Sequence, residues 1–328
     1  ALLGGLALFL YGMHQMSEGL NAAAGEKMKQ ILERLTKNRF LGVGVGAAVT
    51  AVIQSSSATT VMVVGFVNSG MMTLRQAVWI IMGANIGTTI TGQLIALDAG
   101  AVAPLLAFLG VVLILFVGKD RIRYIGGIVA GLGILFIGMD MMGEAMQPLC
   151  DSQVFLRAMT RFEHPVLGIL AGAAFTAAIQ SSSASVGILQ TLAQGGAVSF
   201  AGAVYVLFGQ NIGTCITAVL AAIGTGRNAK RTTIIHLSFN LIGTVVFTVL
   251  CMTTPLVSLV AQLTPGRPAA QIANMHTIFN IGTTLLLLPA GNLLAGMAEH
   301  LLPDKKSESL AAEQRKAACK KVEDVWNS

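Results

Sequence analysis

The stretch Gln54-Ser55-Ser56-Ser57-Ala58-Thr59-Thr60 is a polar run with small or apolar residues on both sides, and it occurs twice. The second copy, Gln180-Ser181-Ser182-Ser183-Ala184-Ser185, lies 126 residues further on. The same offset aligns Gly42–Leu97 with Gly168–Ile223 without a gap, and 24 of these 56 positions are identical. A second polar run recurs in this register, because Gly83, Asn85-Ile86-Gly87-Thr88 and Thr91 reappear as Gly209, Asn211-Ile212-Gly213-Thr214 and Thr217. We therefore expect two copies of two polar runs to serve one site.

The amino-acid composition indicates whether these polar runs lie in a soluble protein or in a membrane protein. Hydrophobic residues make up 54% of the chain and charged residues 11%, and 37 of the 328 residues are glycine. This is too apolar for a soluble domain of such size, so the sequence predicts an all-α integral membrane protein. Apolar segments of roughly 17–25 residues can cross the bilayer core. We count seven of them, at Leu2–Leu20, Gln76–Leu97, Val102–Gly118, Ile125–Gln147, Gly202–Ile223, Thr232–Met252 and Met275–Ala298.

The segment that carries the first polar run, from Gly42 to about Gly70, is too long for one simple crossing and is interrupted by four consecutive polar residues. Each half extends roughly 19 Å at 1.5 Å per residue, which reaches about the middle of the bilayer. Irregular backbone at that depth is tolerated only where it is buried in protein or lines a polar cavity. We therefore predict a re-entrant helical hairpin at about 42–70, with its tip at Gln54–Ser57, and a second one at about 168–196. Before the first hairpin, Asn21–Phe40 has the basic and apolar spacing of an amphipathic helix lying along the membrane interface.

The basic residues test this topology. If both hairpins are re-entrant, three crossings separate equivalent points of the two copies, so the copies have inverted topology. On that arrangement 18 of the 21 Lys and Arg residues lie on one side, and only Arg157, Arg161 and Arg267 lie on the other. Positive charge marks the cytoplasmic side, so we expect the N-terminus outside and the C-terminus in the cytoplasm. The net charge of +6 then reflects topology, and no nucleic-acid partner is expected.

The chain accordingly divides into repeat 1 (1–125), repeat 2 (126–252), an additional transmembrane helix (253–300) and a cytoplasmic tail (301–328). Each repeat is expected to contain a re-entrant hairpin and a broken transmembrane helix. Inverted repeats whose broken helices meet at the membrane midplane are typical of secondary transporters.

The paired Gln-Ser-Ser-Ser and Asn-Ile-Gly-Thr motifs resemble those of the type II sodium-phosphate cotransporter family, over roughly residues 1–298. The resemblance implies sodium-driven uptake of inorganic phosphate by a multi-pass protein of the cell inner (plasma) membrane. Phosphate and sodium ions would be held between the two hairpins and the adjacent unwound helices. Some bacterial members carry a C-terminal PhoU-like helical domain, and residues 303–328 resemble the charged start of one, or equally a solvated cytoplasmic helix.

The residues of the first polar run fit a phosphate site. A new half-helix begins after each tip, so its first amides are unpaired and its N-terminal end is positive, which favours an anion. Hydroxyl groups there can cap those amides or donate to phosphate oxygens. The predicted phosphate-binding residues are Gln54, Ser55, Ser56, Ser57, Gln180, Ser181, Ser182 and Ser183.

The second polar run fits sodium. Its glycines, at positions 83, 87, 209 and 213, would permit the helix to unwind and free carbonyl oxygens for the ion. Ser and Thr also bond back to the preceding turn in transmembrane helices, so a structural role is the alternative for Thr88 and for the threonines one turn before each glutamine. The predicted sodium ligands are Ser55, Ser181, Asn85, Thr88, Thr89, Asn211, Thr214, Thr50 and Thr176.

Three further residues are candidates for the site. Asp140 lies inside an apolar span, where carboxylates are rare and often functional, although a hydrogen-bonded carboxylate near the outer interface is the alternative. Its counterpart in repeat 1 is His14. Asn240 and Asn280, each within a His-x-x-Phe-Asn pattern, are candidates for contacts to the ion ligands.

Other functional classes fit less well. A serine hydrolase would need a nucleophile elbow, and the chain has no G-x-S-x-G motif. A channel would need a continuous polar stripe, whereas polarity here is concentrated in discrete runs. The four scattered cysteines suggest neither a disulfide framework nor a zinc site. We therefore predict a transporter and not an enzyme, with sulfate or arsenate as alternative substrates because hydroxyls and helix dipoles bind any tetrahedral oxyanion.

Overall fold

The computed structural model describes residues 1–34, 38–97, 99–150, 152 and 160–303. These residues form helices and short connections, with no strand among them, which confirms the all-α class. In chain order the elements are α1 (Leu2–Arg34), α2 (Arg39–Ile53), α3 (Ser56–Asn68), α4 (Leu74–Ile95), η1 (Gly100–Val102), α5 (Ala103–Phe116), α6 (Asp120–Cys150), η2 (Arg161–Glu163), α8 (Pro165–Ile179), α9 (Ser182–Gln194), α10 (Phe200–Gly213), α11 (Cys215–Ala221), α12 (Arg227–Thr253), α13 (Leu256–Leu263), α14 (Pro268–Leu287) and α15 (Gly291–Leu301).

Four of the described spans are long and apolar enough to cross a membrane: α4, most of α6, α10 together with α11, and α12. The pair α14 and α15 makes a fifth if it counts as one span, although its halves meet at 80°. The expectation of seven crossings is met only in part, since α1 and α5 do not combine this length with this hydropathy. The segment Met275–Ala298, expected to be one crossing, is divided between α14 and α15. Helix α14 ends at Leu287 because Pro289, which follows, has no N–H and its ring clashes with the preceding turn.

Two helical hairpins carry the first polar run and its copy. Helices α2 and α3 are joined by two residues only, and so are α8 and α9. Asn38 accepts a hydrogen bond from the Phe40 N–H at the start of α2, and Pro165 begins α8, where a missing N–H costs nothing. Each of the four helices has 13 or 15 residues, which is too few to cross the bilayer core alone.

The second polar run lies on a continuous helix, so the expected broken helix is wrong in repeat 1. Helix α4 passes through Asn85–Thr88 without interruption. In the second copy α10 and α11 are separated only by Thr214, which itself has helical backbone angles. The glycines permit close packing instead: a Cβ at Gly83 would meet a backbone oxygen of α2, and a Cβ at Gly209 would meet one of α8. Small residues allow this kind of backbone contact between membrane helices.

Helices α1 and α6, the first helices of the two repeats, pack antiparallel along faces rich in glycine. A Cβ at Gly5 would meet the backbone oxygen of Gly138, and one at Gly12 would meet that of Gly131. Helix α1 continues unbroken to Arg34, so most of Asn21–Phe40 is helical and continuous with the first helix, while its placement along the membrane interface stays a prediction. Residues 35–37 of that range lie outside the described part of the chain, and its last two residues belong to α2.

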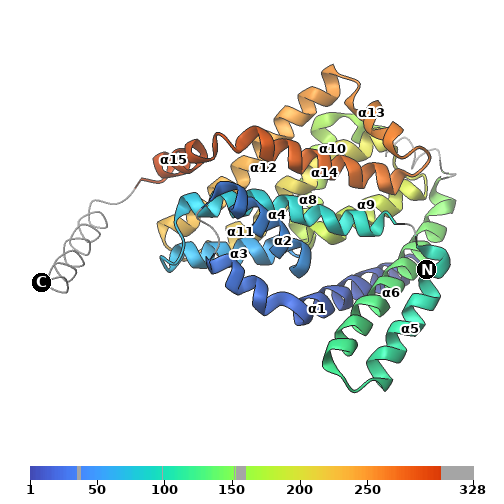
Figure 1. Cartoon of the computed structure of the whole chain (residues 1–328). Helices are drawn as coiled ribbons and strands as arrows, with labels where there is room; N and C mark the ends of the chain where they lie inside the picture. Colours follow the sequence, from blue (N-terminus) through green and yellow to red (C-terminus); the bar gives the residue numbers. More distant parts are fainter. Residues whose placement is uncertain (35–37, 98, 151, 153–159, 304–328) are drawn as a thin grey trace, which may run out of the picture.

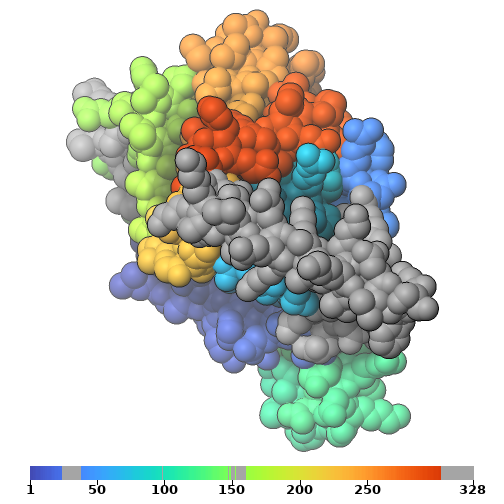
Figure 2. Space-filling model, turned by 90° about the vertical axis from the view of Figure 1, so that its left-hand side faces the viewer, coloured from blue at the N-terminus to red at the C-terminus, as the bar shows by residue number. Residues whose placement is uncertain are grey.

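Helices α1, α5 and α6 form an arm that lies beside the hairpins and the remaining helices (Figure 1). The turn between α5 and α6 projects beyond the other described elements in both views (Figures 1 and 2). Phe9 of α1 joins the arm to the second hairpin, since it is fully buried and a Cβ at Gly187 of α9 would meet its ring. The arm is therefore packed against the hairpins and not merely tethered to them.

Each hairpin has its own apolar core. Around the first, residues of α2, α3 and α4 pack with Ile235 and Phe239 of α12. Around the second, residues of α9 and α10 pack with Phe247 and Phe279 of α12 and α14. Trp79 of α4 lies at the edge of the first core, against Gly42 in the first turn of α2 and Gly291 at the start of α15. Helices α12 and α14 thus brace both hairpins.

Candidate functional site

The two hairpin tips have the same backbone geometry. Gln54 ends α2 with φ 59° and Gln180 ends α8 with φ 58°, and they are the only non-glycine residues with positive φ in the described part of the chain. This left-handed conformation turns the chain sharply, because a single such residue ends a helix and redirects the backbone. Ser55 and Ser181 then cap the next helices, accepting hydrogen bonds from the backbone N–H groups of the residues three positions later at 3.1 Å and 3.3 Å. Each tip therefore places the N-terminus of a helix next to a glutamine side chain.

Buried threonines hold the two helices of each hairpin together. The Thr50 hydroxyl donates to the Thr59 hydroxyl at 3.0 Å, and the hydroxyls of Thr176 and Ser185 lie 2.7 Å apart. Both threonines are fully buried. The structure thus places Thr50 and Thr176 inside the hairpins, where they fix the distance between the two helices of each hairpin.

Threonines of the second polar run form hydrogen bonds with the first tip. The Thr88 hydroxyl donates to the Ser56 hydroxyl at 3.0 Å, and the Thr91 hydroxyl donates to Gln54 Oε1 at 2.8 Å. Gln54 is buried, whereas Gln180 is exposed. The two glutamines therefore differ in environment although their backbones match.

Two side-chain hydrogen bonds join the tip of one repeat to the other repeat. Thr217 donates to the Ser57 hydroxyl at 3.1 Å, and Ser183 donates to the Thr91 hydroxyl at 3.4 Å. The two bonds join equivalent positions, since Ser183 is the counterpart of Ser57 and Thr217 that of Thr91. Each tip is thus bound to the second polar run of the other repeat.

Both tips line one cavity of about 230 Å³. Helix α1 provides the rest of its lining, with Leu10, Met13, His14 and Ser17. All eight residues that we predicted to bind phosphate line it, namely Gln54, Ser55, Ser56, Ser57, Gln180, Ser181, Ser182 and Ser183. The structure therefore brings the two copies of the first polar run together.

Of the described residues that line this cavity, none is Lys, Arg, Asp or Glu, and His14 is the single titratable group. His14 Nε2 lies 3.2 Å from Glu18 Oε1, and both side chains are about two-thirds exposed. His14 and Ser17 are not among the site residues predicted from the sequence. A signal was present, because both are polar residues one turn apart within the apolar segment Leu2–Leu20, but nothing in the sequence indicated which face of that helix meets the tips.

The other predicted sodium ligands lie outside the cavity lining. Asn85 and Asn211 donate to backbone oxygens one turn earlier in their own helices. Thr89 and Thr214 likewise donate to backbone oxygens of the preceding turn. Among the predicted sodium ligands of the second polar run, Thr88 alone forms a side-chain hydrogen bond with a residue that lines the cavity.

The three further candidates also lie away from the cavity. The Asp140 carboxylate lies next to Gly100 in η1, where a Cβ would be 2.8 Å from its Oδ2. Asn280 Nδ2 lies 3.5 Å from Asn211 Oδ1, and Asn240 Nδ2 lies 3.4 Å from the Cys215 sulfur. Asn280 therefore contacts a predicted ion ligand, as expected, whereas Asp140 lies beside the start of α5.

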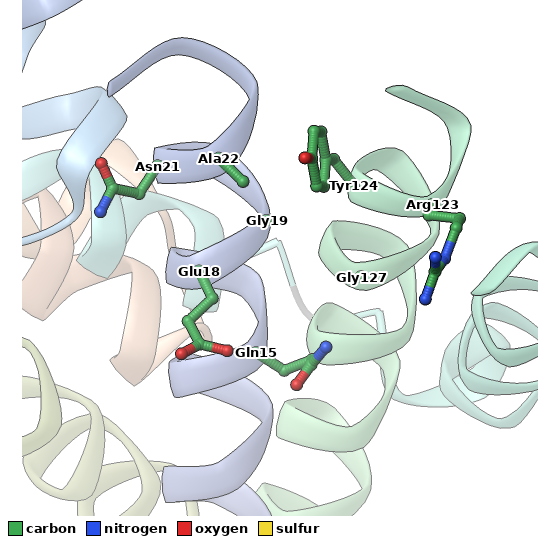
Figure 3. Close-up of a pocket in the computed structure, with 8 residues that line it drawn as sticks. All are labelled: Gln15, Glu18, Gly19, Asn21, Ala22, Arg123, Tyr124 and Gly127. Carbon is green, nitrogen blue, oxygen red and sulfur yellow. The ribbon is translucent and has the colours of Figure 1, made fainter. Parts of the chain in front are cut away.

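A larger cavity of about 520 Å³ lies between α1 and α6 (Figure 3). Its lining includes Gln15 and Glu18 of α1 and Arg123 and Tyr124 of α6. Figure 3 shows Gln15 extending from α1 toward α6. Glu18 lines this cavity and lies next to His14, which lines the smaller one.

Comparison with known protein families matches this chain twice, in agreement with the duplication in its sequence. A family model described as Na+/Pi-cotransporter matches residues 8–144 and again residues 139–264. Uncharacterized protein YqeW of Bacillus subtilis (strain 168) is 34% identical, with 92% of this chain and 97% of that protein aligned. Putative inorganic phosphate export protein YjbB of Escherichia coli (strain K12) is 29% identical over 93% of this chain and 56% of its own length, so this chain spans little more than half of it.

Sodium-dependent phosphate transport protein 2B of Homo sapiens is 40% identical over 98 residues, which is 29% of this chain and 14% of that protein. No solved structure matches the chain. The family model covers most of residues 8–264 and one relative aligns along nearly the full length. Together with the membrane-spanning helices, these matches show that this chain is a multi-pass membrane protein that belongs to the Na+/Pi-cotransporter family.

Proposed function

We propose that this protein transports inorganic phosphate together with sodium ions by alternating access, and that both are bound between the two hairpin tips. The observation that carries the proposal is the single cavity lined by both copies of the Gln-Ser-Ser-Ser run. Relatives bear the names sodium-dependent phosphate transport protein and putative inorganic phosphate export protein. A symporter follows the sum of its ion and substrate gradients, so one mechanism is compatible with uptake and with export.

The chemistry of the lining suits a tetrahedral oxyanion. Helices α3 and α9 both begin at the cavity, and their N-terminal N–H groups and positive dipole ends favour an anion. The serine hydroxyls can donate to phosphate oxygens, or accept a sodium ion with their lone pairs. We assign phosphate to the serines and glutamines of the tips, and sodium to Ser55 and Ser181 with the oxygens of Thr88 and its neighbours.

Inverted repeats are part of the proposal, and paired contacts support them. In an arrangement with two-fold symmetry, a contact between residues i and j implies a contact between their counterparts. The contacts of Gly5 with Gly138 and of Gly12 with Gly131 obey this rule. Because α1 and α6 are equivalent and antiparallel, the axis that relates them is perpendicular to both helices. We therefore propose that each hairpin is re-entrant and that the two enter from opposite sides of the bacterial inner membrane.

Uptake into vesicles tests the function. Purified protein in proteoliposomes is expected to accumulate radiolabelled phosphate when sodium is added outside, and to do so with saturation as the phosphate concentration rises. Potassium or choline in place of sodium should give only leakage, as measured in protein-free liposomes. Equal accumulation of labelled sulfate would change the substrate class, and flux that does not saturate would instead indicate a channel.

Cysteine labelling tests the topology. On a cysteine-free background in intact cells, an impermeant maleimide is expected to label Ser152→Cys, before the second hairpin, and to spare Lys119→Cys, before α6. The physical reason is the excess of Lys and Arg on the side of Lys119, since positive loops stay in the cytoplasm. Labelling of Lys119→Cys without labelling of Ser152→Cys would contradict the proposed orientation.

A further inference from the structure

Gln190 of α9 is fully buried where the second hairpin meets α4 and α14. Its Nε2 donates to the backbone oxygens of Gly92 at 3.0 Å and Ala269 at 2.9 Å. Both donor hydrogens of the amide are thereby used. Its Oε1 is also buried and accepts no hydrogen bond from any described protein group. Gln190 therefore presents one unpaired acceptor inside the protein.

His276 of α14 presents a second acceptor. Asn211 Nδ2 donates to Leu207 O at 3.0 Å, which fixes the orientation of that amide and makes its Oδ1 an acceptor. His276 Nε2 lies 3.2 Å from this Oδ1, so Nε2 must carry the hydrogen. In the neutral ring Nδ1 is then an acceptor. It is buried and, like Gln190 Oε1, has no partner among the described residues.

The two acceptors converge on Gly92 of α4. A Cβ built on Gly92 would lie 3.8 Å from Gln190 Oε1 and 3.9 Å from His276 Nδ1. The nearest other atom is Val186 Cγ1, at 3.6 Å. Two acceptors cannot satisfy each other, and burying both unpaired is unfavourable. A small molecule with two hydrogens to donate would pair with both.

We propose that a single water molecule binds beside Gly92 and donates to Gln190 Oε1 and His276 Nδ1. Two acceptors from different helices suit a buried water, which typically makes two to four hydrogen bonds. A sodium ion would need more oxygen ligands than these two atoms provide. The water links α9 to α14, holds His276 in the tautomer with its hydrogen on Nε2, and so fixes the direction of the Asn211 side chain.

The equivalent position, obtained by exchanging the two repeats, does not have the same site. Ala218 occupies the position equivalent to Gly92, and Val64 occupies the position equivalent to Gln190. The methyl group of Ala218 fills the space that Gly92 leaves open, and the apolar side chain of Val64 has no acceptor to replace that of Gln190. The proposed water therefore adds a difference between the two repeats, although the backbones of their tips have the same geometry.

Nitrogen NMR of the full-length protein with 15N-labelled histidine tests the proposal, because the Nδ1 resonance of a neutral ring moves when that nitrogen accepts a hydrogen bond. The His276→Gln variant identifies the resonance among the five histidines. We expect a hydrogen-bonded, unprotonated Nδ1 in the unmodified protein. In Gly92→Ala, whose methyl enters the space beside the two acceptors and leaves less room for the water, the resonance should move to the position of a free acceptor.

Gly92→Ser is the matched variant, since it fills more space than alanine but brings a hydroxyl that can donate, and it should restore the hydrogen-bonded resonance. Gly65→Ala is the control for helix propensity, because nothing lies within 4 Å of a Cβ there, and it should leave the spectrum unchanged. A resonance that is the same in the unmodified protein and in Gly92→Ala, or an Nδ1 that carries a proton, overturns the proposal. A resonance that shifts when choline replaces sodium would show that the occupant is the ion, which also overturns it.

Discussion

Gln180→Ala is expected to lower phosphate transport about 10- to 100-fold while leaving the protein inserted and folded. The Gln180 side chain is exposed, lines the cavity and forms no hydrogen bond with another described residue. A hydrogen bond to a charged group contributes about 1.5–3 kcal/mol, so its loss corresponds to this fall in transport. The measurement is the initial rate of phosphate uptake in proteoliposomes, with melting temperature measured on the same preparation.

Gln54→Ala should reduce transport to a similar extent but also lower the melting temperature. Gln54 is buried and accepts the hydrogen bond of Thr91, so truncation leaves the hydrogen of that hydroxyl without this acceptor. Glycine variants separate backbone from side chain, because glycine adopts the left-handed conformation without cost. Gln180→Gly should therefore transport as poorly as Gln180→Ala. Unchanged kinetics in Gln180→Ala would show that the second tip is scaffold and not part of the site.

Phosphate affinity is expected to rise about 5- to 150-fold with sodium, the range of typical coupling between two sites. Phosphate carries one to two negative charges, and the cavity lining described here contains no Lys or Arg. Two helix N-termini supply about half a charge each, which leaves a divalent phosphate roughly one charge short. Sodium must supply the remainder, and by linkage phosphate must tighten sodium binding by the same factor.

The measurement is phosphate binding to purified protein across a sodium series, with choline keeping the ionic strength fixed. Potassium should not replace sodium. The His14→Gln variant is the control, because His14 is the one lining group that can itself become positive. Equal phosphate affinity in sodium and choline would contradict the charge argument. If His14→Gln then abolished that affinity, the compensating charge would be identified as the histidine.

The hairpins and the meeting of their tips could be predicted because the signal was local and duplicated. Four polar residues in an apolar segment must leave the lipid, and their recurrence at a fixed offset implies a shared site. The unwinding of the second polar run could not be predicted in the same way. Gly83 and Gly87 are equally consistent with a broken helix and with close backbone packing, and only the position of α2 against α4 decides between them.

Contacts between residues far apart in the chain could also not be predicted from the sequence. His14 and Asp140 occupy equivalent positions, yet one lines the cavity and the other lies beside Gly100. The difference arises because α5 packs on α6, whereas its counterpart α12 packs with the hairpins and α14. The early end of α14 was predictable in principle, since Pro289 lies inside the expected span. The prediction of one span there relied on hydropathy alone, which does not reveal the break.

The position of Trp79 gives the molecule an optical reporter of its own. The chain has two tryptophans, and Trp326 lies in the tail, so a Trp326→Phe variant emits from Trp79 alone. The Trp79 indole lies between the first turn of the first hairpin and the start of α15, in surroundings that exclude most water. Separation of these two elements would expose the indole to water and shift its fluorescence emission to longer wavelength. The fluorescence of the unlabelled protein can therefore follow this junction in real time, in the same vesicles that are used for transport.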